Sequence, residues 1–117
     1  MTTMTTMTNT GPQFMNLHEL ILIPFDDMDW DVLSLNPNAS PILEKNLHKV
    51  NWSNLSSNPG AIHILETNLD KVEWDMLSRN PNAIHILERN LDKVDWPQFS
   101  LNPNAIHLME QNLDEVN

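Results

Sequence analysis

Residues 74–95 read WDMLSRNPNAIHILERNLDKVD, and similar copies of these 22 residues, which differ by substitutions, precede and follow them. Aligning the four tryptophans gives repeats over residues 30–51, 52–73, 74–95 and 96–117. A fixed period of this kind indicates a solenoid, in which each unit is too small to bury its own apolar face and packs on its neighbours. We number the positions of the repeat from 1, at the tryptophan, to 22.

The spacing of apolar residues within the repeat predicts two short helices. The first runs from position 22 of one repeat to position 6 of the next, with Trp at position 1 and Leu or Phe at position 4 on one face. The second runs from position 7 to position 17, with Asn-Pro at positions 7 and 8 as its N-cap and first residue. We expect Asn at position 17 to end this helix in the left-handed conformation.

The sequence therefore predicts an all-α protein, a short α-solenoid of two-short-helix repeats. A leucine-rich-repeat-like α/β solenoid is the alternative, because residues 30–38 follow the pattern L-x-x-L-x-L-x-x-N with Trp in first place. That pattern needs a buried residue at position 6, where the middle repeats have Ser57 and Arg79. Pro at position 8 also favours helices.

The N-terminal 29 residues differ from the repeats. Residues 1–13, MTTMTTMTNTGPQ, show no apolar period and predict a disordered tail. Residues 14–29 resemble the second half of a repeat, because a shift of 22 residues places Leu20 and Ile21 at positions 13 and 14. We expect Asn16 to cap a helix that ends near Ile23, before Pro24, and the segment to cap the first full repeat.

The amino-acid composition limits the classes of function that the protein can have. The 117 residues carry a net charge of −10 and no cysteine, which excludes a disulfide framework and a thiolate metal site. The acidic excess argues against nucleic-acid binding and favours a basic partner. Residues 20–23 form the longest apolar run, too short to span a membrane, and residues 1–15 lack a secretory signal. We expect a soluble, intracellular protein that binds no membrane.

Repeated polar residues give no sign of catalysis or of a cofactor. Position 12 is His in repeats 2 to 4, but neighbouring helices pack ~8–10 Å apart, too far for two imidazoles to share one zinc ion. Position 15 is Glu in all four repeats, and we expect it to accept hydrogen bonds from the next repeat. Identical carboxylates in a row lack the two different environments that acid–base catalysis needs. For the tryptophans, a buried spine is favoured over a base-stacking strip.

Exposed positions that vary between repeats are the candidate contact surface, because the nine positions identical in all copies are needed for the fold. These exposed positions are 9, 12 and 16. The candidate partner-contact residues are Lys45, His63, Thr67, His85, Arg89, His107 and Gln111. They predict a non-enzymatic scaffold that presents a surface to a protein partner.

Two other hypotheses remain open. In the first, the protein self-assembles into a homo-oligomer through the last repeat, whose apolar residues Ala105, Ile106, Leu108 and Met109 have no following repeat to cover them. In the second, the chain is an acidic mimic that blocks a nucleic-acid-binding protein, although lysines interrupt its acidic residues.

The pattern W-x-x-L-S-x-N-P-N-A-I-x-I-L-E-x-N-L-D-K-V-D resembles tandem-repeat proteins of giant DNA viruses of amoebae and of their virophages. The resemblance covers residues 30–117, with one departure: those proteins often have a second Asn-Pro where this chain has Asn-Leu, as at Asn90-Leu91. It implies a repeat fold and a viral origin. It implies no activity and supplies no functional residues.

Overall fold

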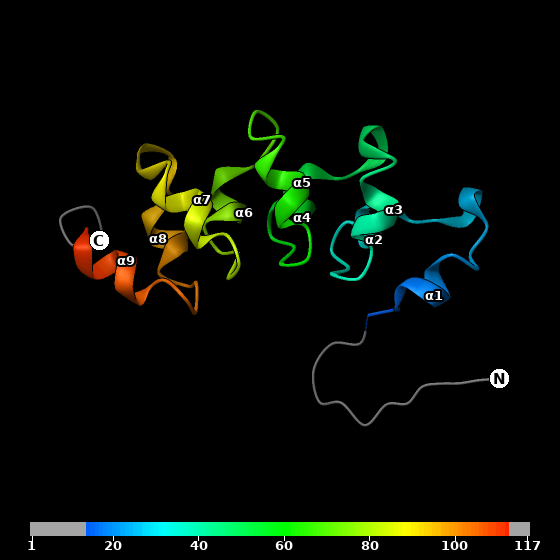
Figure 1. Cartoon of the computed structure of the whole chain (residues 1–117), viewed down its shortest axis with the longest axis horizontal. Coiled ribbons are helices and arrows are strands. Elements are labelled where there is room, and N and C mark those ends of the chain that lie inside the picture. Colours follow the sequence, from blue (N-terminus) through cyan, green and yellow to red (C-terminus); the bar gives the residue numbers. More distant parts are fainter. Residues whose placement is uncertain (1–13, 113–117) are drawn as a thin grey trace, which may run out of the picture.

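A computed structural model describes residues 14–112 of the chain (Figure 1). All regular secondary structure in this range is helical, which confirms the all-α prediction; the leucine-rich alternative, which needs a strand in every repeat, is wrong. The tail predicted over residues 1–13 and the last five residues of the fourth repeat lie outside the described residues. The elements are α1 (Leu17–Leu20), η1 (Phe25–Asp27), α2 (Trp30–Leu33), α3 (Ser40–Leu43), η2 (Leu47–Lys49), α4 (Trp52–Ser56), α5 (Ile62–Glu66), α6 (Trp74–Leu77), α7 (Ile84–Glu88), η3 (Leu91–Lys93), α8 (Trp96–Phe99) and α9 (Ile106–Gln111).

The helices form two rows along the molecule. The first helices of the repeats are α2, α4, α6 and α8, and the second helices are α3, α5, α7 and α9 (Figure 1). Helix α4 packs against α6, and α6 packs against α8. The radius of gyration is 15.9 Å and the dimensions are 54 × 34 × 17 Å. A compact domain of this size has a radius of gyration of about 13 Å, so the molecule is elongated, as a solenoid is.

The first helix of each repeat begins at a polar cap and ends at a serine. The side chains of Asp29, Asn51 and Asp95 each accept a hydrogen bond from a backbone N–H in the first turn, whereas Glu73 does not. At the other end, the Ser56 hydroxyl donates to the Trp52 carbonyl at 2.7 Å and accepts from the Glu73 N–H at 2.9 Å. The serine therefore connects the end of one first helix to the cap of the next. Ser34 and Ser78 make the same pair of bonds.

The second helix starts later than predicted. Helices α3, α5, α7 and α9 begin at position 11, with Ala at position 10 as an N-cap that has no side-chain bond. The prediction that Asn-Pro starts this helix is wrong. Positions 7 to 10 form a turn, in which the Ala83 N–H donates to the Asn80 carbonyl and the Asn82 N–H donates to Asn80 Oδ1. The Asn80 side chain cannot cap a helix because it bonds to this turn and to the preceding repeat.

The end of the second helix also differs from the prediction. Asn46, Asn90 and Asn112 have φ values of −138°, −138° and −133°, so the expected left-handed conformation is wrong. The amide of each asparagine at position 17 donates instead to the carbonyl four residues earlier, as Asn68 does to Ile64 at 2.8 Å. This bond satisfies a carbonyl that the helix end would otherwise leave without a donor.

Buried asparagines at position 7 connect successive repeats. Asn80 Nδ2 donates to the carbonyls of Ser56 and Asn58 in the preceding repeat, each at 3.0 Å. Asn58 and Asn102 make the same two bonds one repeat earlier and one repeat later. We call Asn36, Asn58, Asn80 and Asn102 the asparagine ladder; all four are at most 6% exposed. The ladder fixes the register of the repeats, because each amide must meet two specific carbonyls.

The core is a continuous layer shared by all repeats. Its most buried residues are Leu or Phe at position 4 and Ala at position 10 in all repeats, Leu at 14 in the first three, and Ile or Leu at 13 in the last three. Trp30, Trp52 and Trp74 are half-buried against it, and Trp96 is buried. Position 6 is exposed where it is leucine, at Leu35 and Leu101.

Residues 14–29 pack on the first repeat. Asn16 and Glu19 form a capping box at the start of α1, as the expected cap requires. The helix ends at Leu20 rather than near Ile23. Leu20 is 3% exposed, but Ile21 is 61% exposed and does not occupy the buried place that leucine has at position 14 of the repeats.

Candidate interaction surface

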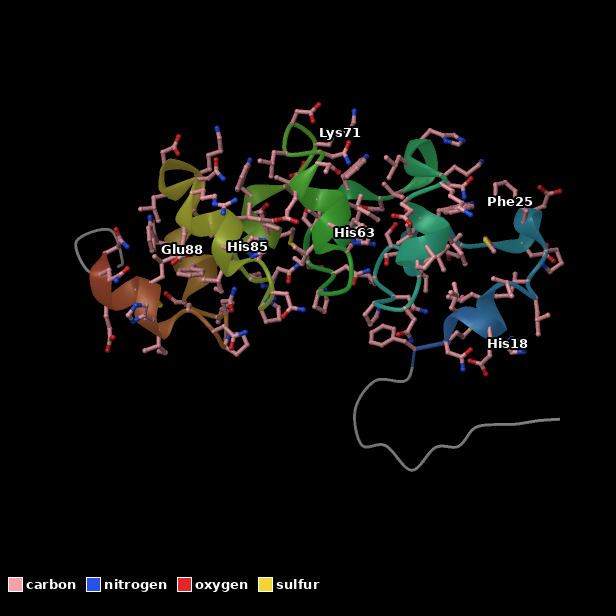
Figure 2. The ribbon with its side chains drawn as sticks, viewed as in Figure 1. His18, Phe25, His63, Lys71, His85 and Glu88 are labelled. Atoms are coloured by element: carbon pink, nitrogen blue, oxygen red, sulfur yellow. The ribbon has the colours of Figure 1, made fainter. Side chains whose placement is uncertain are left out.

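The seven candidate contact residues lie on the second-helix row, within the helices or within two residues of their ends; Figure 2 labels His63 and His85 of this set. His85 is half-buried and the other six are exposed. Because equivalent positions of stacked repeats repeat along the solenoid axis, the row brings residues of positions 12 and 16 onto one face. These are Lys45, His63, Thr67, His85, Arg89, His107 and Gln111.

Two of the three histidines pair with glutamates of the preceding repeat. His63 Nε2 lies 2.9 Å from Glu44 Oε2, and His85 Nε2 lies 2.7 Å from Glu66 Oε2. At Glu44 and Glu66 this geometry agrees with the expectation that Glu at position 15 bonds to the next repeat. All four side chains are 40–57% exposed, so each pair contributes only about 0.2–1 kcal/mol to stability.

The third histidine does not continue the pattern. His107 Nε2 lies 3.4 Å from Gln111 Nε2, on its own helix, rather than pairing with Glu88. Helix α9 is longer than α5 and α7, running to Gln111. Glu88 is thus an exposed carboxylate beside His85 on the same row (Figure 2).

Sequence reasoning expected Glu at position 15 to bond to the next repeat, but it did not identify His at position 12 as the partner. The available signal is the separation of 19 residues that relates Glu44 to His63 and Glu66 to His85. It equals the 22-residue repeat less the difference of three between position numbers 15 and 12. The asparagine ladder was also missed, because position 7 was assigned to a helix N-cap, whereas its amides bond to the preceding repeat at a separation of 22 to 24 residues.

Position 16 holds a different residue in each repeat, and these side chains differ in how free they are to bind a partner. Lys45 and Arg89 are exposed cations. The Thr67 hydroxyl instead donates to carbonyls at the end of α5, at 3.1 and 3.2 Å. The strongest features that this face offers a partner are therefore two cations, set among the glutamates and histidines of positions 15 and 12.

The tryptophans are only partly available for contact. The Lys93 ammonium lies 5.9 Å from the Trp74 ring centroid, and the Lys49 ammonium lies 5.9 Å from the Trp30 ring and 5.4 Å from the Phe25 ring. Each ammonium lies over one face of its ring, so that face is not free for stacking. A base-stacking strip, which needs free ring faces, is not what the structure presents at Trp30 and Trp74.

The apolar face of the fourth repeat is smaller than the sequence suggests. Ala105 and Leu108 are buried, at 0% and 4% exposed, so these two residues offer no surface. Ile106 and Leu101 are 66% and 64% exposed. Ser100 is also exposed, whereas Ser34, Ser56 and Ser78 are fully buried.

Within residues 14–112, no group of three or more His, Asp or Glu side chains could hold a metal ion. Over the same residues, no helix has the length and apolar character to cross a membrane. The chain matches no protein-family model, and neither a curated protein nor a solved structure is detectably similar to it.

Proposed function

We propose that the protein is a non-enzymatic repeat scaffold that presents the second-helix row to a protein partner. The observation that supports this most directly is the division of roles between positions. Ser at 5, Asn at 7 and Asn at 17, identical in every repeat, are used in hydrogen bonds of the fold. Position 16 varies as Lys, Thr, Arg and Gln, is exposed, and bonds to no neighbouring repeat.

The chemistry of this face favours a partner with both acidic and basic groups. Lys45 and Arg89 would pair with carboxylates, and Glu88 and Glu110 with basic side chains. Interfaces that alternate charge in this way gain specificity more than affinity. The resemblance of the repeat to proteins of giant viruses and virophages suggests infected amoebae as the source in which to find the partner.

Site-specific photo-crosslinking tests the proposal. A photoreactive amino acid replaces Arg89 or Thr67 in the full chain, and the matched control replaces Lys71, an exposed residue on the loop after α5 (Figure 2). In extract of infected amoebae we expect one protein to crosslink at positions 89 and 67 and not at 71. The purified partner should then bind Arg89→Gln less tightly than Lys71→Gln. Equal crosslinking at all three positions would contradict the proposal.

Self-assembly is a second candidate function, favoured by the exposed face of the fourth repeat. Ile62 and Ile84 at position 11 are half-buried against the core, whereas Ile106 is 66% exposed. We expect sedimentation coefficients to rise with concentration, and Ile106→Lys or Leu101→Lys to abolish the rise. Leu35→Lys, at the position of repeat 1 that Leu101 has in repeat 4, is the control. A monomer at every concentration would exclude this function.

A further inference from the structure

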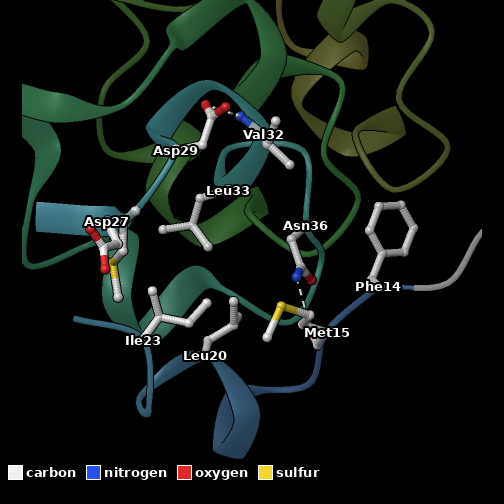
Figure 3. A pocket seen from close by; sticks show the side chains of 10 residues that line it. Phe14, Met15, Leu20, Ile23, Asp27, Asp29, Val32, Leu33 and Asn36 are labelled. Atoms are coloured by element: carbon white, nitrogen blue, oxygen red, sulfur yellow. Dashed lines mark hydrogen bonds between the residues drawn. The ribbon is translucent and has the colours of Figure 1, made fainter. Parts of the chain in front are cut away.

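A cavity of about 290 Å³ lies between the N-terminal segment and the first repeat (Figure 3). Its floor is apolar, with Leu20 and Leu33 buried and Ile23 half-buried. Its mouth is formed by exposed side chains, with Val32 at 62% and Phe14 at 47%. The volume is just below the ~300–1,000 Å³ typical of small-molecule pockets, and suits one large apolar side chain.

The cavity exists because the N-terminal segment is an imperfect copy of the repeat. In the first three repeats, leucine at position 14 is fully buried, at Leu43, Leu65 and Leu87. The corresponding residue here is Ile21, which is 61% exposed because α1 has already ended at Leu20. The apolar volume that this leucine supplies elsewhere is therefore missing beside Leu33.

The residues that line the cavity carry only negative formal charge. Asp27 and Asp29 line it, and Glu19, Asp26 and Asp31 lie on the same two segments. Residues 14–44 contain no Lys or Arg. The nearest cation in sequence with an assigned contact is Lys49, whose ammonium faces the rings of Phe25 and Trp30. Among the described residues, no Lys or Arg pairs with a carboxylate of this group.

We propose that this cavity is a docking site for a short peptide segment that places one large apolar side chain in it and flanks that side chain with Lys or Arg. The inference rests on the proposed scaffold function and adds a second contact site with a defined partner chemistry. The apolar anchor gains its energy by filling a desolvated pocket, as anchor residues of protein interfaces do. The acidic rim selects basic flanks, and it should make association depend on salt concentration.

A panel of fluorescein-labelled decapeptides tests the site with the full chain. The probes carry a central Leu, Phe or Trp between two pairs of Lys, and the controls have central Ala, or Glu or Ser in place of Lys. We expect binding only for a large central residue with Lys flanks, and weakening as salt rises. Binding that ignores the central residue or the flanks would overturn the inference.

Substitutions test whether the peptides bind in this cavity. Leu33→Phe is expected to fill the cavity without disrupting the fold, because the fourth repeat has Phe99 at the same position, 0% exposed. It should weaken peptide binding at least on the order of tenfold, which corresponds to ~1.4 kcal/mol. Asp27→Asn should weaken it by less, and Asp75→Asn, an exposed acidic residue of repeat 3, should not. If circular dichroism shows that Leu33→Phe is misfolded, Val32→Lys at the mouth serves instead. Unchanged binding in Leu33→Phe or Val32→Lys would refute the site.

A photoreactive residue at position 32 distinguishes other occupants. A covalent bond to the decapeptide supports the inference. A bond to residues 1–13 of the same chain, or a covalent dimer, would overturn it in favour of the tail or of a second copy. The scaffold proposal is tested separately at Arg89, so its crosslinks can persist when the peptides fail to bind, and the two failures are distinguishable.

Discussion

At the scale of single residues, buried amides decide how repeats meet. Each buried member of the asparagine ladder in repeats 2 to 4 donates to two carbonyls of the preceding repeat and accepts from the N–H two residues later. An asparagine side chain carries two N–H donors and an acceptor oxygen, and glutamine, which carries the same groups, is one methylene longer. This explains why position 7 is Asn in all four repeats, where a helix N-cap alone would also accept Ser or Asp.

Asn80→Ala should therefore be strongly destabilising. It leaves the carbonyls of Ser56 and Asn58 buried with one donor fewer, and a buried polar group left without its partner costs about 1–3 kcal/mol. We expect a loss of about 2–4 kcal/mol in the free energy of unfolding, measured by urea denaturation. Asn82→Ala is the control: it removes one exposed bond, to the Pro59 carbonyl at 2.9 Å, and should cost less than about 1 kcal/mol. Equal losses in the two variants would contradict a structural role for the ladder.

Gly60 is the exception at position 9, which is Asn in the other repeats. A Cβ atom built on Gly60 would lie 2.1 Å from the Pro37 carbonyl oxygen and 2.8 Å from two further backbone atoms of Pro37. We expect Gly60→Ala to force repeats 1 and 2 apart and to lower the unfolding free energy by about 1–3 kcal/mol, as overpacking does. Asn104→Ala at the same position of repeat 4 should be milder. An unfolding free energy unchanged in Gly60→Ala would mean that this junction can relax freely.

At the scale of the elements, four- to six-residue helices are too short to be stable alone. Their ends are therefore as important as their faces. Three of the four first helices have a side-chain cap, at Asp29, Asn51 and Asp95, and α6 has Glu73, whose side chain makes no cap bond. The glutamate is one methylene longer, which places its carboxylate beyond the N–H groups of the first turn.

Glu73→Asp should stabilise the protein, since a good N-cap is worth about 0.5–2 kcal/mol. Asp95→Glu, the reverse exchange at α8, should destabilise it by a similar amount, because the bond from the Gln98 N–H would be lost. Both are measured as shifts of the urea midpoint at constant slope. Both variants exchange one carboxylate side chain for the other, so the net charge stays the same. If the two urea midpoints shifted in the same direction, capping would not be the cause.

The elements also show what could be predicted from the sequence. The period and the apolar spacing are local properties, so two helices per repeat followed from residues such as Trp74 and Leu77. The start of the second helix could not be predicted in this way, because the Asn80 amide bonds to carbonyls of the preceding repeat and does not cap the helix. The left-handed conformation expected of Asn90 was wrong for a related reason: its amide reaches the Ile86 carbonyl from a negative φ. The cavity beside Leu33 depends on where α1 ends, which apolar spacing alone does not determine.

At the scale of the whole molecule, the chain is close to one-dimensional. Each repeat contacts mainly its neighbours, so stability approximates a sum of repeat terms and junction terms. Repeats 2 and 3 have a described repeat on both sides, with the ladder and a His–Glu pair at junctions 1–2 and 2–3. In the described part of repeat 4, Ser100, Leu101 and Ile106 are exposed.

Amide hydrogen exchange should therefore reveal a gradient along the solenoid. We expect the slowest exchange in α4 to α7 and the fastest among the repeats in α9, because Ile106 and Leu101 are exposed and opening α9 breaks fewer buried contacts. Mass spectrometry of peptic fragments measures this on the native protein without denaturant. Asn80→Ala, which weakens the junction between repeats 2 and 3, should speed exchange in α6 to α9 more than in α2 and α3. If every helix instead exchanged at one common rate, the protein would open as a single cooperative unit, and the exposed face of repeat 4 would be no weaker than the middle of the chain.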